Sequence, residues 1–294
     1  MQRTGADASF EATPPATAPG TARAPADAAG DPALREWHRF TPGQRLARFV
    51  VYLVIVAAIV TAAQTIEIIP EFLADAPEQV ADLLTRMWPV DWASYRTDVH
   101  AALVETIHIA ALGTLLALIL ALPVGVLAAH NLVRSTPLNL LAKFILVASR
   151  SVNSLVWALL FVGIFGPGAL AGTLAIAFRS IGFVGKLVGE ALEEAQPGPV
   201  EALSAAGAPW RSILLFGYWP QVKPAFWSIA LFRFDINVRE SAVLGLVGAG
   251  GIGMALDAAL NLFQWPRVAL ILLSIFMVVV IAEIVVTQLR RRVI

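Results

Sequence analysis

Charged and amide side chains gather in one apolar segment of this sequence, residues 225–243. The segment holds Arg233, Asp235, Asn237, Arg239 and Glu240. On an α-helix, Arg233, Asn237 and Glu240 would share one face, while Asp235 and Arg239 would lie four residues apart on another. A charge in the middle of a membrane costs at least ~2.5–3.5 kcal/mol, so these residues either pair structurally inside a helix bundle or line a polar path. The sequence leaves both interpretations open.

Three further polar residues occur inside apolar segments: Arg150, Asn153 and Arg179. The same two interpretations apply to them. A guanidinium group suits an oxyanion of phosphorus better than an ammonium group does, because its fixed N–H donors match two oxygens at once. If the chain handles such an anion, these residues are candidates for its path.

Patterns for catalysis, metal binding and nucleotide binding are absent or incomplete. Cysteine is absent, the four histidines are scattered, and neither H-E-x-x-H nor the phosphate-binding loop G-x-x-x-x-G-K-[ST] occurs. We therefore predict no catalytic residue and no metal site. One glycine-rich segment formally matches G-x-G-x-x-G, but it follows an apolar helix instead of a strand. We interpret its glycines as points where helices break or approach closely: Gly248, Gly250, Gly251 and Gly253.

The elements that must position these residues are membrane helices. Hydrophobic residues make up 58% of the 294 and charged residues 14%, against ~45–50% and ~25% in soluble domains. The net charge is zero, so no basic face for nucleic acid is expected. A spanning helix needs about 20 mostly apolar residues. We predict an all-α polytopic membrane protein in contact with lipid, with one N-terminal span and a five-helix core: 49–66, 103–129, 144–165, 169–189, 225–243 and 268–289.

The chain is expected to divide into three parts. Residues 1–33, rich in Ala and Pro, predict a disordered cytoplasmic tail. Residues 34–102 hold the first span and a periplasmic segment, and 103–294 form the transmembrane domain. The Lys and Arg residues that flank the spans set the orientation, with both termini cytoplasmic in a bacterial inner membrane. Three flank the outer side, Arg86, Arg96 and Arg267, and eleven the inner: Arg35, Arg39, Arg45, Arg48, Arg134, Lys143, Arg211, Lys223, Arg290, Arg291 and Arg292.

Residues 190–224 form a long cytoplasmic segment in which we expect two short helices, at 199–206 and 210–219. Glu201 and Ala202 are expected on the exposed face of the first, Gly207 to allow a sharp turn, and Pro220 to stop the second before the fifth span. The alternative is that Gly207 and Pro220 are ordinary turn-forming and helix-ending residues of a loop. The run from Glu201 to Gly207, followed by Pro220, resembles the EAA loop of ABC importer permeases, although Leu203, Gly217 and Trp219 depart from its pattern. We call residues 190–224 the EAA-like loop.

The resemblance extends over most of the chain from about residue 105, and it is to the phosphonate importer permeases. It is carried by the runs 190–203, 219–222, 233–241 and 243–253. The resemblance implies a non-catalytic membrane subunit of an ATP-driven importer for phosphonate or a related phosphorus oxyanion. It also implies a periplasmic phosphonate-binding protein and a cytoplasmic ATP-binding subunit. Because importer permeases carry two membrane subunits around one path, we expect a homodimer, with a pair of this chain and a paralogue as the alternative. The ATP-binding subunit would bind ATP and magnesium, and this chain would carry no cofactor.

Other functions remain open at this stage. The solute could be phosphite, a phosphate ester or an amino acid. The chain could also be an ATP-independent secondary transporter or channel, although such folds usually show two repeated halves, and no convincing repeat is present. A polytopic membrane enzyme would need catalytic groups that converge at one membrane face.

Overall fold

The computed structural model of the protein describes residues 42–66, 70–133 and 135–293. The predicted tail at 1–33 lies outside the described residues. The chain divides into two units, Met1–Pro70 and Glu71–Ile294, which we describe separately. All regular elements of the described part are helices, and no strand occurs there.

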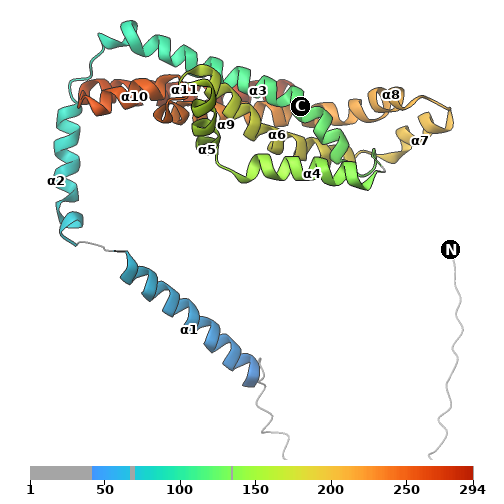
Figure 1. The fold of residues 1–294 in the computed structure, drawn as a ribbon, viewed down its shortest axis with the longest axis horizontal. Helices are drawn as coiled ribbons and strands as arrows, with labels where there is room; N and C mark the ends of the chain where they lie inside the picture. The colour runs from blue at the N-terminus through green and yellow to red at the C-terminus, as the bar shows by residue number, and fades with distance from the viewer. Residues whose placement is uncertain (1–41, 67–69, 134, 294) are drawn as a thin grey trace, which may run out of the picture. The chain divides into compact units, whose positions relative to one another are not determined.

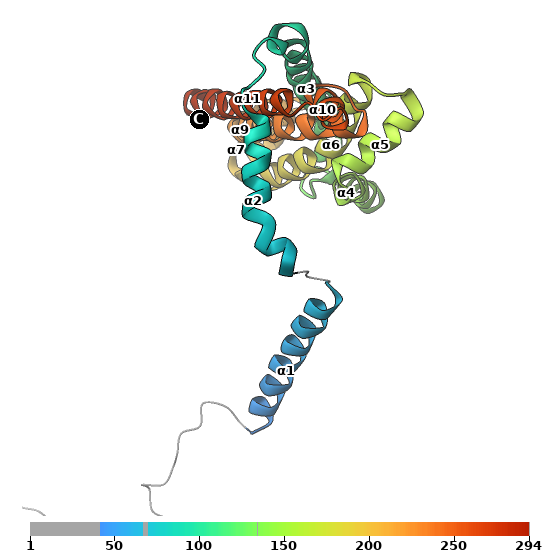
Figure 2. The same ribbon diagram turned by 90° about the vertical axis from the view of Figure 1, so that its left-hand side faces the viewer.

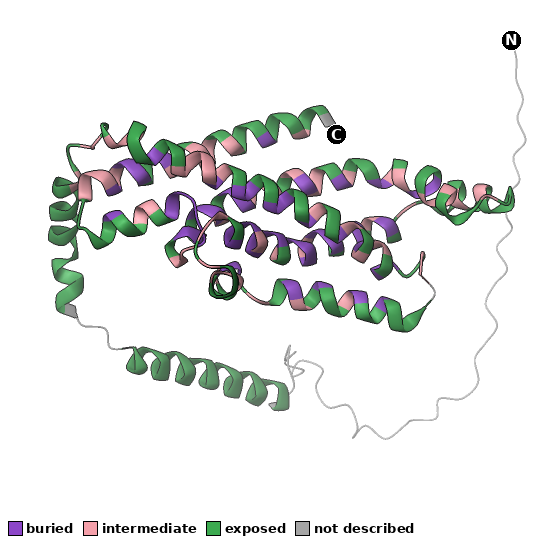
Figure 3. Cartoon of the chain, turned by 45° about the horizontal axis from the view of Figure 1, so that its top comes forward, coloured by how far each residue is buried: buried purple, intermediate pink, exposed green. Residues whose placement is uncertain are grey.

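The first unit contains the helix α1, Pro42–Thr65. Its 24 residues correspond to about 36 Å of helix, enough to cross a hydrocarbon layer of about 30 Å. The described side chains of α1 are exposed along its whole length, which Figure 3 shows as a green helix. An apolar helix with this much exposed surface fits a helix surrounded by lipid.

The second unit holds the remaining elements, which Figure 1 labels. They are α2 (Pro70–Met87), η2 (Tyr95–Val99), α3 (His100–Ala128), α4 (Thr136–Ser151), α5 (Ser154–Phe165), α6 (Ala169–Glu193), α7 (Pro197–Ala205), α8 (Trp210–Ser212), η3 (Ile213–Tyr218), α9 (Trp219–Leu244), η4 (Gly245–Val247), α10 (Ile252–Asn261) and α11 (Trp265–Val293). Here η2 and η3 are π-helical and η4 is a 3-10 turn. In Figure 1, α7 and α8 lie at one end of this helix bundle and α10 at the other.

Helix α6 is the centre of the bundle. It packs against α3, α4, α5 and α9, and the view along the bundle in Figure 2 places it between α3 and α4. Glycines make this packing close. A Cβ atom added at Gly182 of α6 would lie 2.4 Å from the carbonyl oxygen of Leu146 in α4, and one added at Gly125 of α3 would lie 2.8 Å from the carbonyl oxygen of Gly185. Membrane helices associate through such small residues because lipid offers no hydrophobic driving force between them.

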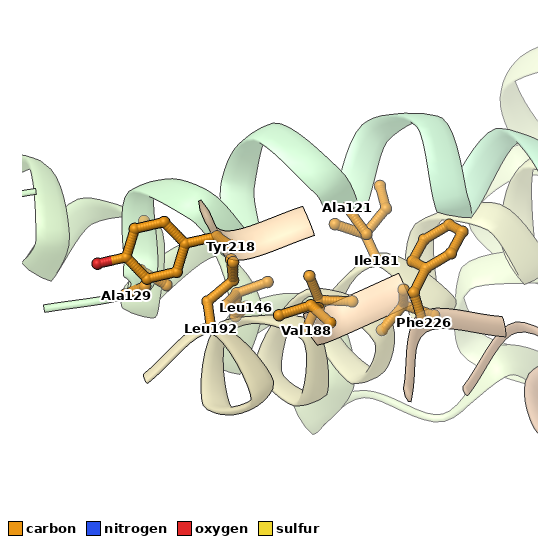
Figure 4. Close-up of a cluster of buried hydrophobic side chains, with 12 residues drawn as sticks. Ala121, Ala129, Leu146, Ile181, Val188, Leu192, Tyr218 and Phe226 are labelled. Carbon is orange, nitrogen blue, oxygen red and sulfur yellow. The ribbon is translucent and has the colours of Figure 1, made fainter. Parts of the chain in front are cut away.

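A cluster of buried apolar side chains joins the bundle to the second half of the EAA-like loop. Figure 4 shows Leu146 of α4 and Val188 of α6 in the same cluster as Tyr218 of η3 and Phe226 of α9. Ala121 of α3 completes the contact from the opposite side. The end of the EAA-like loop is therefore part of the packed core.

The predicted third span, 144–165, is wrong as a single straight helix. Helices α4 and α5 meet at an angle of 92°, and the helix breaks at Val152 and Asn153. The side-chain oxygen of Asn153 accepts a hydrogen bond from the backbone N–H of Leu155 at 3.1 Å and caps α5. Asn is common at the N-cap position of a helix because its side chain accepts a hydrogen bond from a backbone N–H that has no partner in a preceding turn. Four helices of the described part are long and apolar enough to span a membrane, and six spans result if each of two bent helix pairs counts as one.

The expected role of Pro220 is also wrong. The chain is helical without interruption from Trp210 through η3 and α9 to Leu244, and Pro220 lies in the first turn of α9. Proline lacks a backbone N–H, so Pro220 removes one helical hydrogen bond at the junction of the π-helical η3 with α9, but it does not end the helix. The fifth span and the second loop helix thus form one continuous rod.

Candidate functional site

A buried polar cluster connects α3, α6 and α9. Asn237 of α9 donates a hydrogen bond from Nδ2 to Oγ1 of Thr114 in α3 at 2.8 Å, and its Oδ1 accepts one from Oγ of Ser180 in α6 at 3.3 Å. Arg233 donates from Nε to the same Ser180 oxygen at 2.8 Å. Asn237 and Ser180 are fully buried, and Arg233 is 3% exposed. Because buried polar groups need partners, this network fixes how the three helices meet.

Glu240 extends the cluster toward the bundle surface. Its carboxylate forms an ion pair with Arg179 of α6, and its Oε2 lies 3.5 Å from Nη2 of Arg233. Two guanidinium groups therefore share one carboxylate, which leaves a net positive charge. The predicted face of Arg233, Asn237 and Glu240 is thus turned toward α3 and α6.

Asp235 and Arg239 form the ion pair that their spacing predicts. The Asp235 side chain is 11% exposed and that of Arg239 is 51% exposed. The second carboxylate oxygen of Asp235, Oδ1, is buried without a hydrogen-bond partner. Removal of Arg239 would leave this carboxylate almost without compensation.

A hollow of about 330 Å³ brings four of the predicted residues together. Its polar lining comes from Asn153 at the break between α4 and α5, Arg179 of α6, and Arg239 and Glu240 of α9. The rest of the lining is Ser154, Leu155, Val243 and Leu244. We call this space the arginine hollow. Each of the two guanidiniums has a carboxylate partner, Glu240 for Arg179 and Asp235 for Arg239, and donors that these partners leave free can hold an anion by charge-assisted hydrogen bonds.

Arg150 does not join this group. It lines a second hollow of about 260 Å³ between α4 and α6, together with Lys143 and Lys186. The sequence marks Lys143 only as a flanking cation and does not mark Lys186 as a site residue, because a lysine near the end of a span commonly extends its charge toward the membrane surface.

The glycine-rich segment forms the break between η4 and α10. Gly248, Gly250 and Gly251 have φ angles of +83°, +85° and +74°, a region in which side chains other than glycine are strained. The carbonyl oxygen of Gly248 accepts a hydrogen bond from the N–H of Gly168 at 2.9 Å, just before α6. A Cβ atom at Gly253 would lie 2.3 Å from the carbonyl oxygen of Ala242. The segment is therefore a tight turn packed against its neighbours.

The EAA-like loop is a helix–turn–helix at the end of the bundle. Glu201 and Ala202 are exposed on α7. After α7 the chain turns at Gly207, whose φ is +73°. The side chain of Gln221 holds the base of the loop: its Oε1 accepts from the backbone N–H of Gln196 at 2.9 Å, and its Nε2 donates to the carbonyl oxygen of Gly217 at 2.7 Å.

Comparison with known proteins identifies the family. The model of the binding-protein-dependent transport system inner membrane component matches residues 121–294. The chain belongs to this family.

Two relatives carry related names. The phosphate-import permease protein PhnE of Mycolicibacterium smegmatis is 36% identical over 239 residues, which cover 81% of this chain and 45% of the relative. The phosphite transport system permease protein PtxC of Stutzerimonas stutzeri is 39% identical over 204 residues, 69% of this chain and 74% of the relative. This chain thus spans less than half the length of the first relative.

Solved structures share the fold. An amino acid ABC transporter chain has a TM-score of 0.57 at 20% identity over 69% of this chain and 99% of that one. The MetNI methionine ABC transporter in an inward-facing conformation has a TM-score of 0.57 at 21% identity, and the match covers 67% of this chain and 96% of that one. The predicted resemblance to importer permeases and the all-α polytopic fold are confirmed, and a member of this family is a transport component instead of a catalyst.

Several polar residues in and near the site carry no signal in the sequence. Thr114 and Ser180 complete the buried cluster, and Thr106 accepts a hydrogen bond from the N–H of Ile252 at 2.7 Å. Uncharged Ser and Thr are common in membrane helices, where they can bond to their own backbone. Only their position opposite a more polar residue on another helix, which the sequence does not show, identifies them as part of a polar cluster.

Proposed function

We propose that this chain is the permease subunit of an ATP-driven importer that moves phosphonate or a related phosphorus oxyanion into the cell. The arginine hollow is the observation that carries the proposal, because it presents Arg179, paired with Glu240, Arg239, paired with Asp235, and the side chain of Asn153. The names of the two relatives, one for phosphate import and one for phosphite transport, support the same class of solute.

The continuous rod from Trp210 to Leu244 supports a coupling mechanism. One end of the rod lies in the EAA-like loop, and the other carries Arg233, Asn237, Arg239 and Glu240. If an ATP-binding subunit bound α7, its movement would be transmitted to this rod by the turn at Gly207 and by the hydrogen bonds of Gln221. A shift of the rod would move Arg239 and Glu240 relative to Arg179 on α6. Rigid movement of packed helices is a common way to transmit such a change.

The proposal includes the partners and the orientation. Two copies of this chain enclose the path, a periplasmic binding protein delivers the solute, and a cytoplasmic subunit binds ATP and magnesium. Both termini and the EAA-like loop lie in the cytoplasm, which the eleven inner and three outer Lys and Arg residues favour.

Uptake tests the solute and the role of the arginine hollow. Cells that express the whole transporter should accumulate labelled methylphosphonate or phosphite, and Arg179→Lys should lower uptake about tenfold or more, because lysine keeps the charge but loses the bidentate geometry. Arg291→Lys, at an exposed arginine near the end of α11, is the matched control. Unchanged uptake in Arg179→Lys would exclude the hollow from the path. Uptake without the ATP-binding subunit would indicate a secondary transporter.

Cysteine labelling tests the orientation, since the chain contains no cysteine. In cells with a permeabilised outer layer, an impermeant thiol reagent should label Gln79→Cys in α2 and leave Ser204→Cys in α7 unlabelled. Both residues are exposed in the structure. The opposite pattern would invert the topology.

A further inference from the structure

The second hollow lies at the end of the bundle where α6 leads into the EAA-like loop. Lys143 and Arg150 line it from α4, and Lys186 lines it from α6. Lys143 and Arg150 are seven residues apart, so they lie on one face of α4. The other lining residues are Ala128, Leu146, Val147, Gly189, Glu190 and Glu193.

The two carboxylates of this hollow already have partners. Glu190 lies 3.3 Å from Nζ of Lys186. Oε1 of Glu193 accepts a hydrogen bond from the backbone N–H of His130 and contacts Nδ1 of the same residue, both at 2.9 Å. These contacts hold Glu193 on the turn between α3 and α4, which reduces its repulsion toward an anion in the hollow.

The cations are less completely paired. Lys143 contacts the His130 ring at 3.1 Å, but it has no carboxylate partner within salt-bridge distance among the described residues. Arg150, near the end of α4, has neither an ion pair nor a hydrogen bond from its side chain in the described part of the chain. Arg150 is exposed at the mouth of the hollow. An arginine on an apolar membrane helix usually faces a polar partner or a substrate path.

We infer that this hollow binds a phosphate-class oxyanion, with Arg150 and Lys143 as its main ligands. Lys186 would exchange Glu190 for the anion as the anion enters. Along α6, Lys186 is seven residues from Arg179 of the arginine hollow, which corresponds to about 10 Å along the same face. The site is thus a second station between the arginine hollow and the loop end of the bundle, and it accepts the anion before release. This inference rests on the proposed function for the direction of transport and the class of solute.

Phosphate binding to the full-length chain in lipid nanodiscs tests the site. The chain is used without the ATP-binding subunit, because a nucleotide site would bind phosphate as well. Inorganic phosphate should raise the unfolding temperature, since a ligand that binds only the folded state stabilises it. Arg150→Gln should raise the half-stabilising phosphate concentration about tenfold, as expected for the loss of a charge-assisted contact.

Two further variants make the result decisive. Lys143→Gln, a substitution in the middle of α4, should also weaken phosphate binding and covers the case in which Arg150→Gln does not fold. Lys223→Gln removes an exposed charge outside the hollow and should change nothing. Equal phosphate responses in all three variants, or an equal response of the unaltered chain to chloride at the same ionic strength, would overturn the inference.

The outcome separates this inference from the proposed function. If cells import phosphonate but phosphate does not stabilise the chain, the second station is excluded and the importer stands. If phosphate binds through Arg150 but no phosphorus oxyanion is imported, the hollow is an anion site and the proposed solute is wrong.

Discussion

Glycine is required for different reasons in two regions of the molecule, the contact between α4 and α6 and the EAA-like loop. Gly182 lies inside α6, where an added Cβ atom would be 2.4 Å from the carbonyl oxygen of Leu146. Gly207 lies after α7, where nothing of this chain is within 4 Å of such an atom, but its φ is +73°. The first glycine is required by packing, and the second by backbone conformation. The bundle is therefore specified by its own contacts, while the loop leaves an open surface for a partner.

The charged residues repeat this contrast. Arg233, Asn237 and Glu240 are satisfied by groups on other helices of the same chain. Glu201 is exposed on α7. Substitutions in the bundle should consequently affect folding first, and substitutions in the loop should affect coupling without loss of the folded chain.

The largest effect is expected for Gly182→Ala. The backbone oxygen of Leu146 cannot move away from an added methyl group without separating α4 from α6. The same two helices are also joined by a hydrogen bond from the N–H of Gly182 to Oγ of Ser149 at 3.1 Å. We expect destabilisation by about 3 kcal/mol, the upper part of the range for overpacking. The yield of monodisperse protein in detergent measures it. Gly163→Ala, in open space within α5, is the control, and equal yields of the two variants would contradict the close contact.

Gly207→Asp should abolish uptake and leave the protein in the membrane. The positive φ adds a local cost of about 1 kcal/mol, too little to unfold the chain, whereas a new charge on a surface gripped by an ATP-binding subunit should reduce its capture more than about tenfold. Co-purification of that subunit and solute uptake measure the effect. Gly198→Asp places the same charge in the same loop without a positive φ and, like Gly207, has open space. Normal uptake with Gly207→Asp at matched membrane levels would remove the turn from the mechanism.

Arg239→Ala should reduce assembly several-fold, because Asp235 would remain 11% exposed with no cation. Loss of one partner of a buried pair costs ~3–5 kcal/mol, and the half-exposed Arg239 side chain lowers our estimate to about 2 kcal/mol. The double variant Asp235→Ala, Arg239→Ala should recover assembly. Normal assembly of the single variant with loss of uptake would instead assign Arg239 to the path alone.

Glu201→Ala should have the smallest effect, a decrease in uptake of about two- to threefold. It removes one exposed carboxylate without adding bulk, and a single solvent-exposed contact contributes ~0.2–1 kcal/mol. The ATPase rate stimulated by the binding protein is a sensitive measurement. An effect as large as that of Gly207→Asp would show that the contact at Glu201 is buried in the complex.

The order of the elements and much of the candidate site were predictable from local sequence. The apolar runs gave all the long spans, and the i,i+4 spacing gave the Asp235–Arg239 pair. The exposed face of α7 and the turn at Gly207 also followed from local pattern. These features depend on helix periodicity and on residues close together in the chain.

Other features required the tertiary structure. An apolar run looks the same whether it is straight or bent, so the 92° break at Asn153 was not visible in it. Pro220 suggests the end of a helix as readily as its first turn. Two other features bring together residues of different helices. They are the ion pair of Arg179 with Glu240 and the separate hollow that Arg150 lines. Sequence determines which residues a helix offers on each face. Which residue of another helix lies opposite is decided by close backbone contacts such as that of Gly182 with Leu146, because these set the depth at which the helices meet.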